Sequence, residues 1–157
     1  MNRKIFTAAF SLFIIMLQVS PYAQSGADAG KKNISGMGQF SVNDKVLNDF
    51  LRIDLIRRDD FWKGKLNTIL ETEASIVSVE NKTQFRRKYR ITAVSGSENR
   101  ILITYYIYTD NEEYIRILQP GEKFGFKGQF VMYTPLNTKR NAYVFDIILE
   151  DGAAVVE

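Results

Sequence analysis

Residues 118–130 read LQPGEKFGFKGQF and contain the features that decide the fold. Pro120 and Gly121 end any preceding helix, because proline lacks a backbone N–H and glycine adopts turn conformations freely. Beyond this turn, apolar and polar residues alternate, which is typical of a strand with one buried face. Gly128 interrupts the apolar row, and a glycine in a strand permits tight curvature or close approach of another backbone. The stretch therefore predicts a curved strand over residues 124–134.

Other segments of the chain repeat this strand pattern. They are residues 66–80, 84–94, 100–109 and 142–150, all rich in β-branched and aromatic residues. In the first segment the apolar side changes partway, which predicts a bulge or bend around Ala74 to Ile76. Residues 110–119 allow one or two helical turns between the third and fourth strands. From the second strand to the fifth, the residues expected to face the core are Phe85, Tyr89, Ile91, Ala93; Ile101, Ile103, Tyr105, Ile107; Phe124, Phe126, Phe130, Met132; and Tyr143, Phe145, Ile147, Leu149.

An amphipathic helix is predicted ahead of the strands, over residues 42–58. Ser41 is placed to cap its first turn, and Asp44 stands three residues later, in the position of a capping box. Apolar residues fall on one broad side of this helix. We expect that side to pack on the main core; the alternative is a helix that binds a partner. The apolar side consists of Val46, Leu47, Phe50, Leu51, Ile53, Leu55 and Ile56.

Five consecutive strands with a short helix between the third and the fourth describe a small Greek-key barrel, the architecture of the OB-fold. The predicted fold class is therefore mainly β: a five-stranded Greek-key OB-fold barrel with a preceding amphipathic α-helix. A six-stranded open barrel or a small β-sandwich would accommodate the same strands.

Residues 118–130, the helical segment before them and the approach FWKGK at residues 61–65 resemble the exported bacterial OB-fold proteins grouped as tRNA-anti-like. The shared pattern is a leucine, two residues, a glycine, alternating apolar residues and another glycine at the start of strand four. It covers about Trp62 to Asp151. The resemblance implies an exported OB-fold protein that binds its ligand on strands two and three, flanked by the loops after strands one and four.

The first 23 residues have the order of a secretory signal peptide. Arg3 and Lys4 precede an uncharged apolar stretch from Ile5 to Leu17, and small residues follow up to Ala23. The apolar stretch of about 13 residues is shorter than the roughly 20 that a membrane-spanning helix needs. We expect cleavage after Ala23, with a cut near Ser25 or an uncleaved anchor as alternatives. The mature protein is then periplasmic or secreted.

The remainder of the chain divides by composition. Residues 24–40 contain few large apolar groups and are predicted to be a flexible leader. The helix is assigned to residues 41–61, the OB-fold barrel to 62–151 and a C-terminal tail to 152–157. No segment after the leader is apolar enough to span a membrane, so we expect no transmembrane segment after signal cleavage.

Neither cysteine nor histidine occurs in the sequence. This excludes Ser-His-Asp and Cys-His nucleophiles, disulfides, and thiolate or imidazole metal sites. It also excludes the lipid anchor of a bacterial lipoprotein, which is attached to cysteine. The paired carboxylates Asp59-Asp60 and Glu112-Glu113 are adjacent, and adjacent side chains do not face each other as two catalytic acids must. We therefore expect no enzyme activity, no cofactor and no bound metal.

A basic surface is predicted on strands two and three. Removal of the leader lowers the formal net charge from +3 to about +1, so any basic surface must be local. Arg86, Lys88 and Arg90 point outward in a row on the second strand, at intervals of about 7 Å. Tyr106 and Tyr108 are expected beside them, and the loops at residues 81–83 and 135–141 add further cations. The candidate ligand-binding residues are Lys82, Arg86, Lys88, Arg90, Tyr106, Tyr108, Lys139 and Arg140.

This surface predicts a non-catalytic, exported binding module that recognises an anionic protein segment, a glycan or another envelope component. A structural or assembly accessory of a cell-envelope complex is one alternative. An oligonucleotide-binding protein is another, ranked lower because nucleic acid is scarce outside the cytoplasm. The basic face also has an explanation without a ligand: its charges keep the protein soluble and prevent edge pairing, with Glu71 and Glu73 paired across to Arg86 or Lys88.

Overall fold

The computed structural model describes residues 38–96, 101–139 and 142–155. The predictions for the signal peptide and for most of the leader therefore lie outside the described residues. In chain order the elements are β1 (Gln39–Ser41), α1 (Asp44–Arg52), the 3₁₀ turn η1 (Leu55–Arg57), α2 (Arg58–Lys63), β2 (Ile69–Gln84), β3 (Arg87–Gly96), β4 (Ile101–Thr109), α3 (Glu113–Ile117), β5 (Lys123–Lys139) and β6 (Ala142–Ala154).

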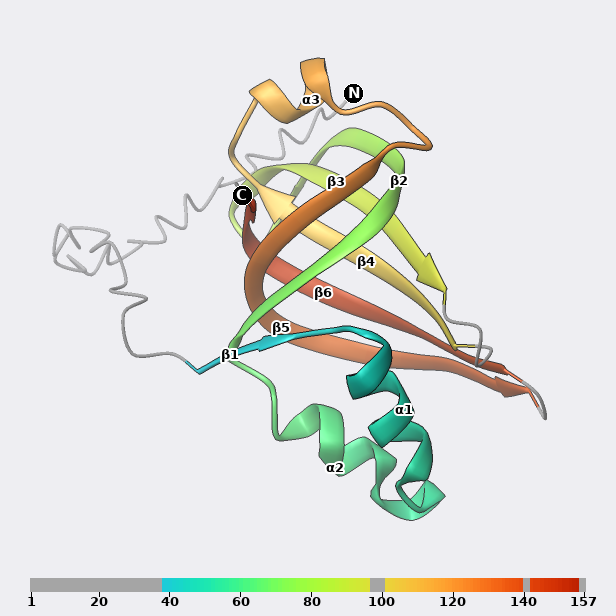
Figure 1. Cartoon of the computed structure of the whole chain (residues 1–157). Coiled ribbons are helices and arrows are strands. Elements are labelled where there is room, and N and C mark those ends of the chain that lie inside the picture. Colours follow the sequence, from blue (N-terminus) through green and yellow to red (C-terminus); the bar gives the residue numbers. More distant parts are fainter. Residues whose placement is uncertain (1–37, 97–100, 140–141, 156–157) are drawn as a thin grey trace, which may run out of the picture. The chain divides into compact units, whose positions relative to one another are not determined.

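Within these residues the strands form one sheet in the order β1-β2-β3-β4-β6-β5, and β2 also pairs with β5. The first half of β2 pairs with β5, and its second half pairs with β3, so β2 closes the ring (Figure 1). β4 and β6 pair in parallel, with Ile101 opposite Tyr143 and Ile107 opposite Leu149. The fold is therefore a mainly β, OB-like barrel, as predicted, and two stacked sheets are excluded.

The sheet has six strands rather than five because of β1. Gln39 and Ser41 pair in parallel with Ile69 and Glu71, at the start of β2. The predicted flexible leader is therefore wrong at its C-terminal end, where residues 39 and 40 are part of the sheet. Phe40 also packs against the barrel, with its ring 6.1 Å from that of Phe130.

The predicted bend in the first long strand is confirmed. β2 leaves β5 after Ser75 and shifts its register against β3 between Ile76 and Ser78. At the bend, the N–H of Ile76 donates to the carbonyl of Glu122 at 2.8 Å, and its carbonyl accepts from the N–H of Gly121 at 2.8 Å. Such an irregularity increases the local twist, which lets one strand pair with two partners.

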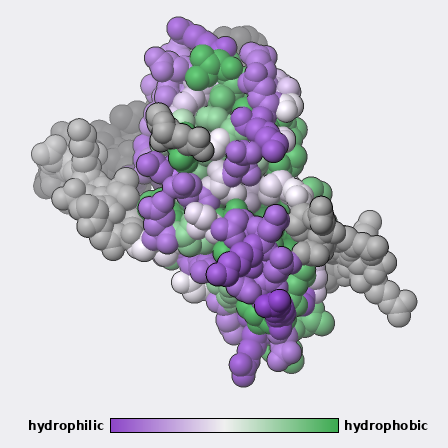
Figure 2. All heavy atoms as spheres, in the orientation of Figure 1, coloured by the Kyte–Doolittle hydropathy of each residue, from purple (hydrophilic) through white to green (hydrophobic). Residues whose placement is uncertain are grey.

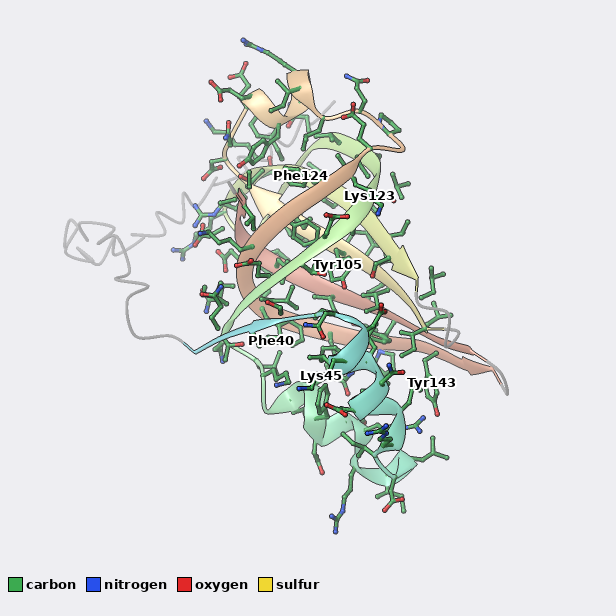
Figure 3. The ribbon with its side chains drawn as sticks, in the orientation of Figure 1. Phe40, Lys45, Tyr105, Lys123, Phe124 and Tyr143 are labelled. Atoms are coloured by element: carbon green, nitrogen blue, oxygen red, sulfur yellow. The ribbon has the colours of Figure 1, made fainter. Side chains whose placement is uncertain are left out.

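The barrel interior contains most of the side chains that the alternation predicted. Phe85 and Tyr89 are exceptions, because both are only partly buried and lie outside the core, and Phe85 is in a turn. Ile101, Ile103, Tyr105 and Ile107 are buried, as are Phe126, Phe130, Phe145, Ile147 and Leu149, and Figure 3 shows Tyr105 between the strands. Met132 does not follow the prediction, because it is 45% exposed. A register shift between Phe130 and Met132 reverses the side to which the later residues of β5 point.

Two glycines allow β6 to lie close to its neighbours: Gly128 on the β5 side and Gly152 on the β4 side. A Cβ on Gly128 would lie 3.1 Å from both the Cβ of Leu149 and the carbonyl oxygen of Glu150, as expected for a glycine placed for close backbone approach. A Cβ on the buried Gly152 would overlap Cγ2 of Ile107. Because β6 runs on to Ala154, the predicted tail from residue 152 is wrong over its first three residues.

The predicted single helix over residues 42–58 is wrong: α1 ends at Arg52, the 3₁₀ turn η1 follows, and a second helix, α2, begins at Arg58. Asn43, rather than Ser41, caps α1, and its side-chain oxygen accepts from the N–H of Val46 at 3.0 Å. The first helix ends because the guanidinium of Arg58 donates to the carbonyls of Leu51 and Ile53, at 2.8 and 2.9 Å.

This break changes which apolar side chains face the core. Leu47 and Phe50 are buried, but Leu55 and Ile56 fall in η1 and are 69% and 93% exposed. The two helices cover one end of the barrel, and α3 lies at the other end (Figure 1). None of the described helices is long and apolar enough to cross a membrane.

Candidate binding surface on the outer face of the barrel

The hairpin between β2 and β3 turns at Phe85 and Arg86. Both residues have positive φ angles, of 52° and 61°. Two consecutive residues of this kind form the turn that matches the twist of antiparallel strands. Arg86 therefore lies in the turn and not on the strand, so the predicted row of three outward cations is wrong. On β3 the row consists of Lys88 and Arg90.

A β-bulge in β2 places Lys82 opposite Lys88, near the hairpin turn. Asn81 pairs with Tyr89 and Gln84 pairs with Arg87, so Lys82 and Thr83 together oppose Lys88. Residues 81–83 therefore belong to β2 and are not the predicted loop. The result is a group of exposed cations at the tip of the hairpin, which we call the hairpin cluster: Lys82, Arg86 and Lys88.

No ion pair within the described part of the chain involves the hairpin cluster. The charge of Lys82 acts weakly on Glu80, but the carboxylate of Glu80 forms its ion pair with Arg90. The backbone N–H of Lys88 donates to Asp110 at 3.1 Å, which fixes the strand and leaves the ammonium group exposed. The cluster therefore presents positive charge to solvent.

Arg90 has a different environment from the hairpin cluster. Its guanidinium donates to both carboxylate oxygens of Glu80, at 3.1 and 3.0 Å, and lies 5.1 Å from the centre of the Tyr106 ring. The hydrogen bonds from Arg90 and Ser78 lower the pKa of Glu80. Arg90 is therefore neutralised and covers one face of Tyr106, so neither group is open to a ligand on that side.

Tyr108 is not available as a stacking surface either. Its side chain is 3% exposed, its hydroxyl donates to the side-chain oxygen of Gln84 at 2.6 Å, and its ring lies 5.0 Å from that of Phe85. Tyr108 lies beside Arg90 on the neighbouring strand, as predicted, but it is not exposed, because Phe85 covers its ring. Tyr108 supports the hairpin turn.

Of the two remaining predicted cations, the structure describes Lys139 alone. Lys139 is the last residue of β5, where it pairs with Ala142. Arg140 lies outside the described residues. Residues 135–139 therefore belong to β5 and are not the predicted loop. Lys88 lies at the opposite end of the ring of strands from Lys139, since Tyr89 pairs with Thr109 while Ile101, at the start of β4, pairs with Tyr143.

Arg87 is a structural cation of the hairpin that the sequence analysis did not identify. It donates to Asp110 at 2.9 Å and also pairs with Asp151 and, at 4.0 Å, with Glu150. Burial acts to lower the pKa of Arg87, but the hydrogen bond and the surrounding carboxylates raise it on balance. Arg87 thus ties the hairpin to the end of β6. The sequence could have predicted that Arg87 is half-buried opposite Gln84 only if the turn had been placed at Phe85 and Arg86.

The proposed cross-strand pairing of Glu71 and Glu73 with the cations is wrong. Glu71 accepts from the side chain of Gln39 at 2.7 Å, and Glu73 pairs with Lys123 at 3.4 Å. Both acids lie where β2 pairs with β5, on the far half of the strand from the hairpin. The hairpin cluster is therefore not neutralised by them.

The described residues also bear on catalysis and metal binding. Among them, no group of three or more Asp or Glu side chains is placed to hold a metal ion. Asp59, one of the paired carboxylates, accepts from the hydroxyl of Tyr133 at 2.6 Å. Arg116 pairs with Glu112 at 2.7 Å on the surface of α3. These contacts give Asp59 and Glu112 structural partners.

Comparison with solved structures finds distant likeness. A lipoprotein from Klebsiella pneumoniae to which nucleic-acid binding has been ascribed aligns over 81% of this chain and 98% of its own, with a TM-score of 0.44 and 14% sequence identity. A chain from Leishmania major assigned as an aspartyl-tRNA synthetase aligns over 82% of this chain and 23% of its own, with a TM-score of 0.37 and 7% identity. No protein-family model and no curated protein matches the sequence.

At these scores the activity of neither structure bears on this chain. The OB-like barrel rests on the strand order and register described above. Membership of the tRNA-anti-like group of exported proteins stays a prediction.

Proposed function

We propose that this protein is an exported, non-catalytic binding module that holds an anionic partner against the hairpin cluster. The observation that carries the proposal is the position of Lys82, Arg86 and Lys88, which are exposed and have no acidic partner among the described residues. A positive patch of this kind attracts anionic groups and steers their approach. Its turn is held by Phe85 and Tyr108 and by the Arg87 ion pairs, so the cations are presented from a fixed hairpin.

The partner we propose is an acidic protein segment or an anionic glycan of the cell envelope rather than an oligonucleotide. OB-folds that bind single-stranded nucleic acid stack bases on exposed aromatic side chains. Here Phe85 covers Tyr108, and Arg90 lies over Tyr106. Recognition by charge alone suits carboxylate or sulfate groups, which need no stacking platform.

An assembly accessory is a second candidate, favoured by exposed apolar side chains away from the hairpin cluster. Ile115 and Ile117 of α3 are 38% and 61% exposed. Figure 2 shows hydrophobic atoms at the α3 end among hydrophilic ones. Such a contact would be insensitive to salt, whereas binding at the hairpin cluster should weaken steeply between about 50 and 200 mM salt.

The test is a titration of the mature protein with three labelled probes: poly-L-glutamate, polygalacturonate and oligo-dT. Charge reversal of the cluster (K82E, R86E and K88E together) should raise the Kd for the bound probe by about tenfold or more, because three attractive contacts become repulsive. The matched control reverses three exposed lysines elsewhere, K45E, K63E and K127E, with the same change in net charge.

Equal loss in both triple variants would show that net charge, and not this surface, governs binding. Preferential binding of oligo-dT would replace the proposed partner with nucleic acid. Binding that neither salt nor the cluster variant changes would favour the assembly accessory.

A further inference from the structure

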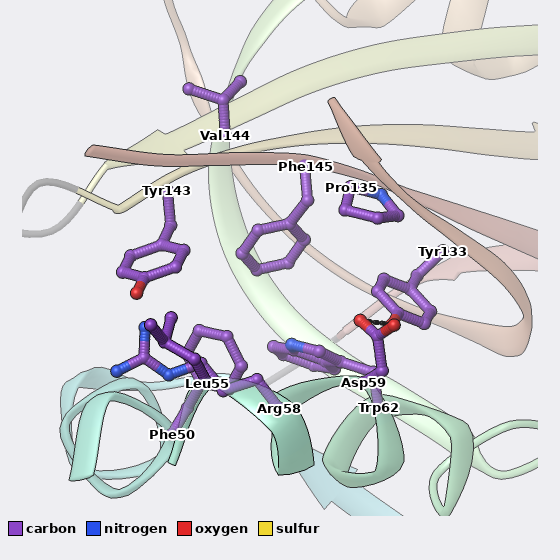
Figure 4. Close-up of a pocket in the computed structure, with 10 residues that line it drawn as sticks. All are labelled: Phe50, Leu55, Arg58, Asp59, Trp62, Tyr133, Pro135, Tyr143, Val144 and Phe145. Atoms are coloured by element: carbon purple, nitrogen blue, oxygen red, sulfur yellow. Dashed lines mark hydrogen bonds between the residues drawn. The ribbon is translucent and has the colours of Figure 1, made fainter. Parts of the chain in front are cut away.

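An aromatic cavity lies between the N-terminal helices and the strands β5 and β6, away from the hairpin cluster. Its volume is about 90 Å³, and Figure 4 shows strand side chains on one side of it and helix side chains on the other. Roughly 10–15 Å³ of such space holds one water molecule, so the cavity admits a small organic molecule. The aromatic walls are formed by Phe50, Trp62, Tyr133, Tyr143 and Phe145.

Two hydrogen-bond donors of this cavity have no partner in the described residues. Trp62 is 1% exposed, and its indole Nε1 is buried without an acceptor. The Nη1 of Arg58 is also buried without an acceptor, although Nε and Nη2 donate to the carbonyls of Ile53 and Leu51. Buried donors are nearly always satisfied in folded proteins, so two of them in one cavity call for a ligand with acceptor atoms.

The charge at the cavity is positive at the Arg58 end. In the described part of the chain no carboxylate forms an ion pair with Arg58, whose guanidinium lies 4.4 Å from the centre of the Tyr143 ring. Asp59 is the acid that lines the cavity, and it accepts from the hydroxyl of Tyr133. Burial, together with Asp59, raises the pKa of Tyr133, so its hydroxyl stays protonated and keeps Asp59 engaged.

The two donors occupy different parts of the cavity. Arg58 lies against Tyr143, whereas Trp62 packs on Phe145, at 5.1 Å between ring centres, and on Tyr133, at 6.4 Å. A ligand that satisfies both donors therefore needs two acceptor atoms, and the aromatic walls favour a flat body between them. The end that meets the guanidinium is best matched by an anion.

We propose that this cavity binds a small, flat carboxylic acid that carries a second acceptor atom. The carboxylate accepts from Arg58, the second acceptor accepts from the indole N–H of Trp62, and the ring lies among the aromatic walls. This site is separate from the hairpin cluster and does not depend on the function proposed for that cluster.

The sequence offers a direct reporter, because Trp62 is its single tryptophan. In a ¹H–¹⁵N correlation spectrum the indole N–H gives one side-chain signal that moves when it gains an acceptor. The probes are 4-hydroxybenzoate, benzoate, which lacks the second acceptor, and 4-hydroxybenzamide, which lacks the charge. We expect 4-hydroxybenzoate to bind with a Kd below about 1 mM and to move the indole signal, and the other two to bind about tenfold more weakly.

Neighbouring exposed residues provide a variant and its control without disturbing the core. Leu55 lines the cavity and Ile56 does not, and both are exposed. L55E places a carboxylate at the cavity and should weaken 4-hydroxybenzoate binding by about fivefold or more, whereas I56E should change it less than twofold. The K82E/R86E/K88E protein should bind 4-hydroxybenzoate as the unmodified protein does.

Saturable binding with an indole shift and a loss in L55E alone supports the site. The proposal is overturned if none of the probes binds saturably, if the indole signal is unmoved at saturation, or if L55E and I56E behave alike. None of these outcomes depends on whether poly-L-glutamate or a glycan binds the hairpin cluster.

Discussion

Gly152 sets how closely β6 passes the side chain of Ile107, and its replacement by alanine tests the packing of the barrel. Ile107 is fully buried, and a Cβ on residue 152 would overlap its Cγ2 atom. Overpacking a closed core costs about 1–3 kcal/mol, since side chains and backbone must shift. For a domain of this size we expect G152A to lower the melting temperature by about 4–12 °C.

A double-mutant cycle separates the overlap with Ile107 from the backbone effect of replacing any glycine by alanine. I107A alone removes buried carbons and should cost about 2–5 kcal/mol. In I107A/G152A the new methyl group enters the space that Cγ2 vacates, so the combined loss should be smaller than the sum by about 1 kcal/mol or more. G96A is the control, because a Cβ there lies 3.8 Å from its nearest neighbour.

Stability is measured by urea unfolding of each variant, followed by the fluorescence of Trp62. An additive double mutant, or a G152A protein as stable as G96A, would refute the overlap between Gly152 and Ile107. The register of β6 against β4 at its C-terminal end would then need revision.

Three further predictions concern charge and pH. Burial raises the pKa of Tyr105 to about 12, so the contribution of its neutral hydroxyl to stability is fully present below about pH 10 and is lost as the pH rises toward 12. Y105F should therefore resist alkaline unfolding better than the parent in urea titrations between pH 8 and 11.5. Hydrogen bonds from Arg90 and Ser78 lower the pKa of Glu80, so its contribution is present above about pH 4.5 and is lost on further acidification; the stability difference between the parent and E80Q should shrink over that range, and a constant difference would contradict the pairing. R87Q should lose about 1 kcal/mol or more, because its guanidinium is 26% exposed and faces three carboxylates, while R52Q, whose ion pair with Asp49 is largely exposed, should change by less than about 0.5 kcal/mol.

The barrel was predictable because its strands bury one face each. In residues 101–109 and 142–150 every second residue is apolar, and those residues face the interior. The bend near Ile76 was visible as a change of apolar side, and the close approach at Gly128 as a glycine within an apolar row. These features depend on burial, which the sequence pattern records directly.

The details of the candidate surface were less predictable. The hairpin turns at Phe85 and Arg86, neither of which is a residue that favours positive φ, so no turn-forming pair marks the position. The turn is held instead by long-range contacts, from Phe85 to Tyr108 and from Arg87 to Asp110. A shift of the turn by a few residues changed Arg86 from a strand residue to a turn residue.

The helix break was also not predictable from the apolar pattern. Nothing in residues 42–58 interrupts the apolar pattern, yet α1 ends at Arg52 because Arg58 satisfies the carbonyls of Leu51 and Ile53. Hydrogen bonds from a side chain five to seven residues along the chain thus override the periodicity, and Leu55 and Ile56 are left exposed.

The position of β6 has a consequence for how the chain folds. β6 lies between β4 and β5, so the ring stays open until the last strand has left the ribosome. Pairing β4 with β6 also joins segments about 40 residues apart, and such non-local contacts form slowly. The barrel can therefore close only after β6 has joined β4 to β5, so closure is a late step in folding.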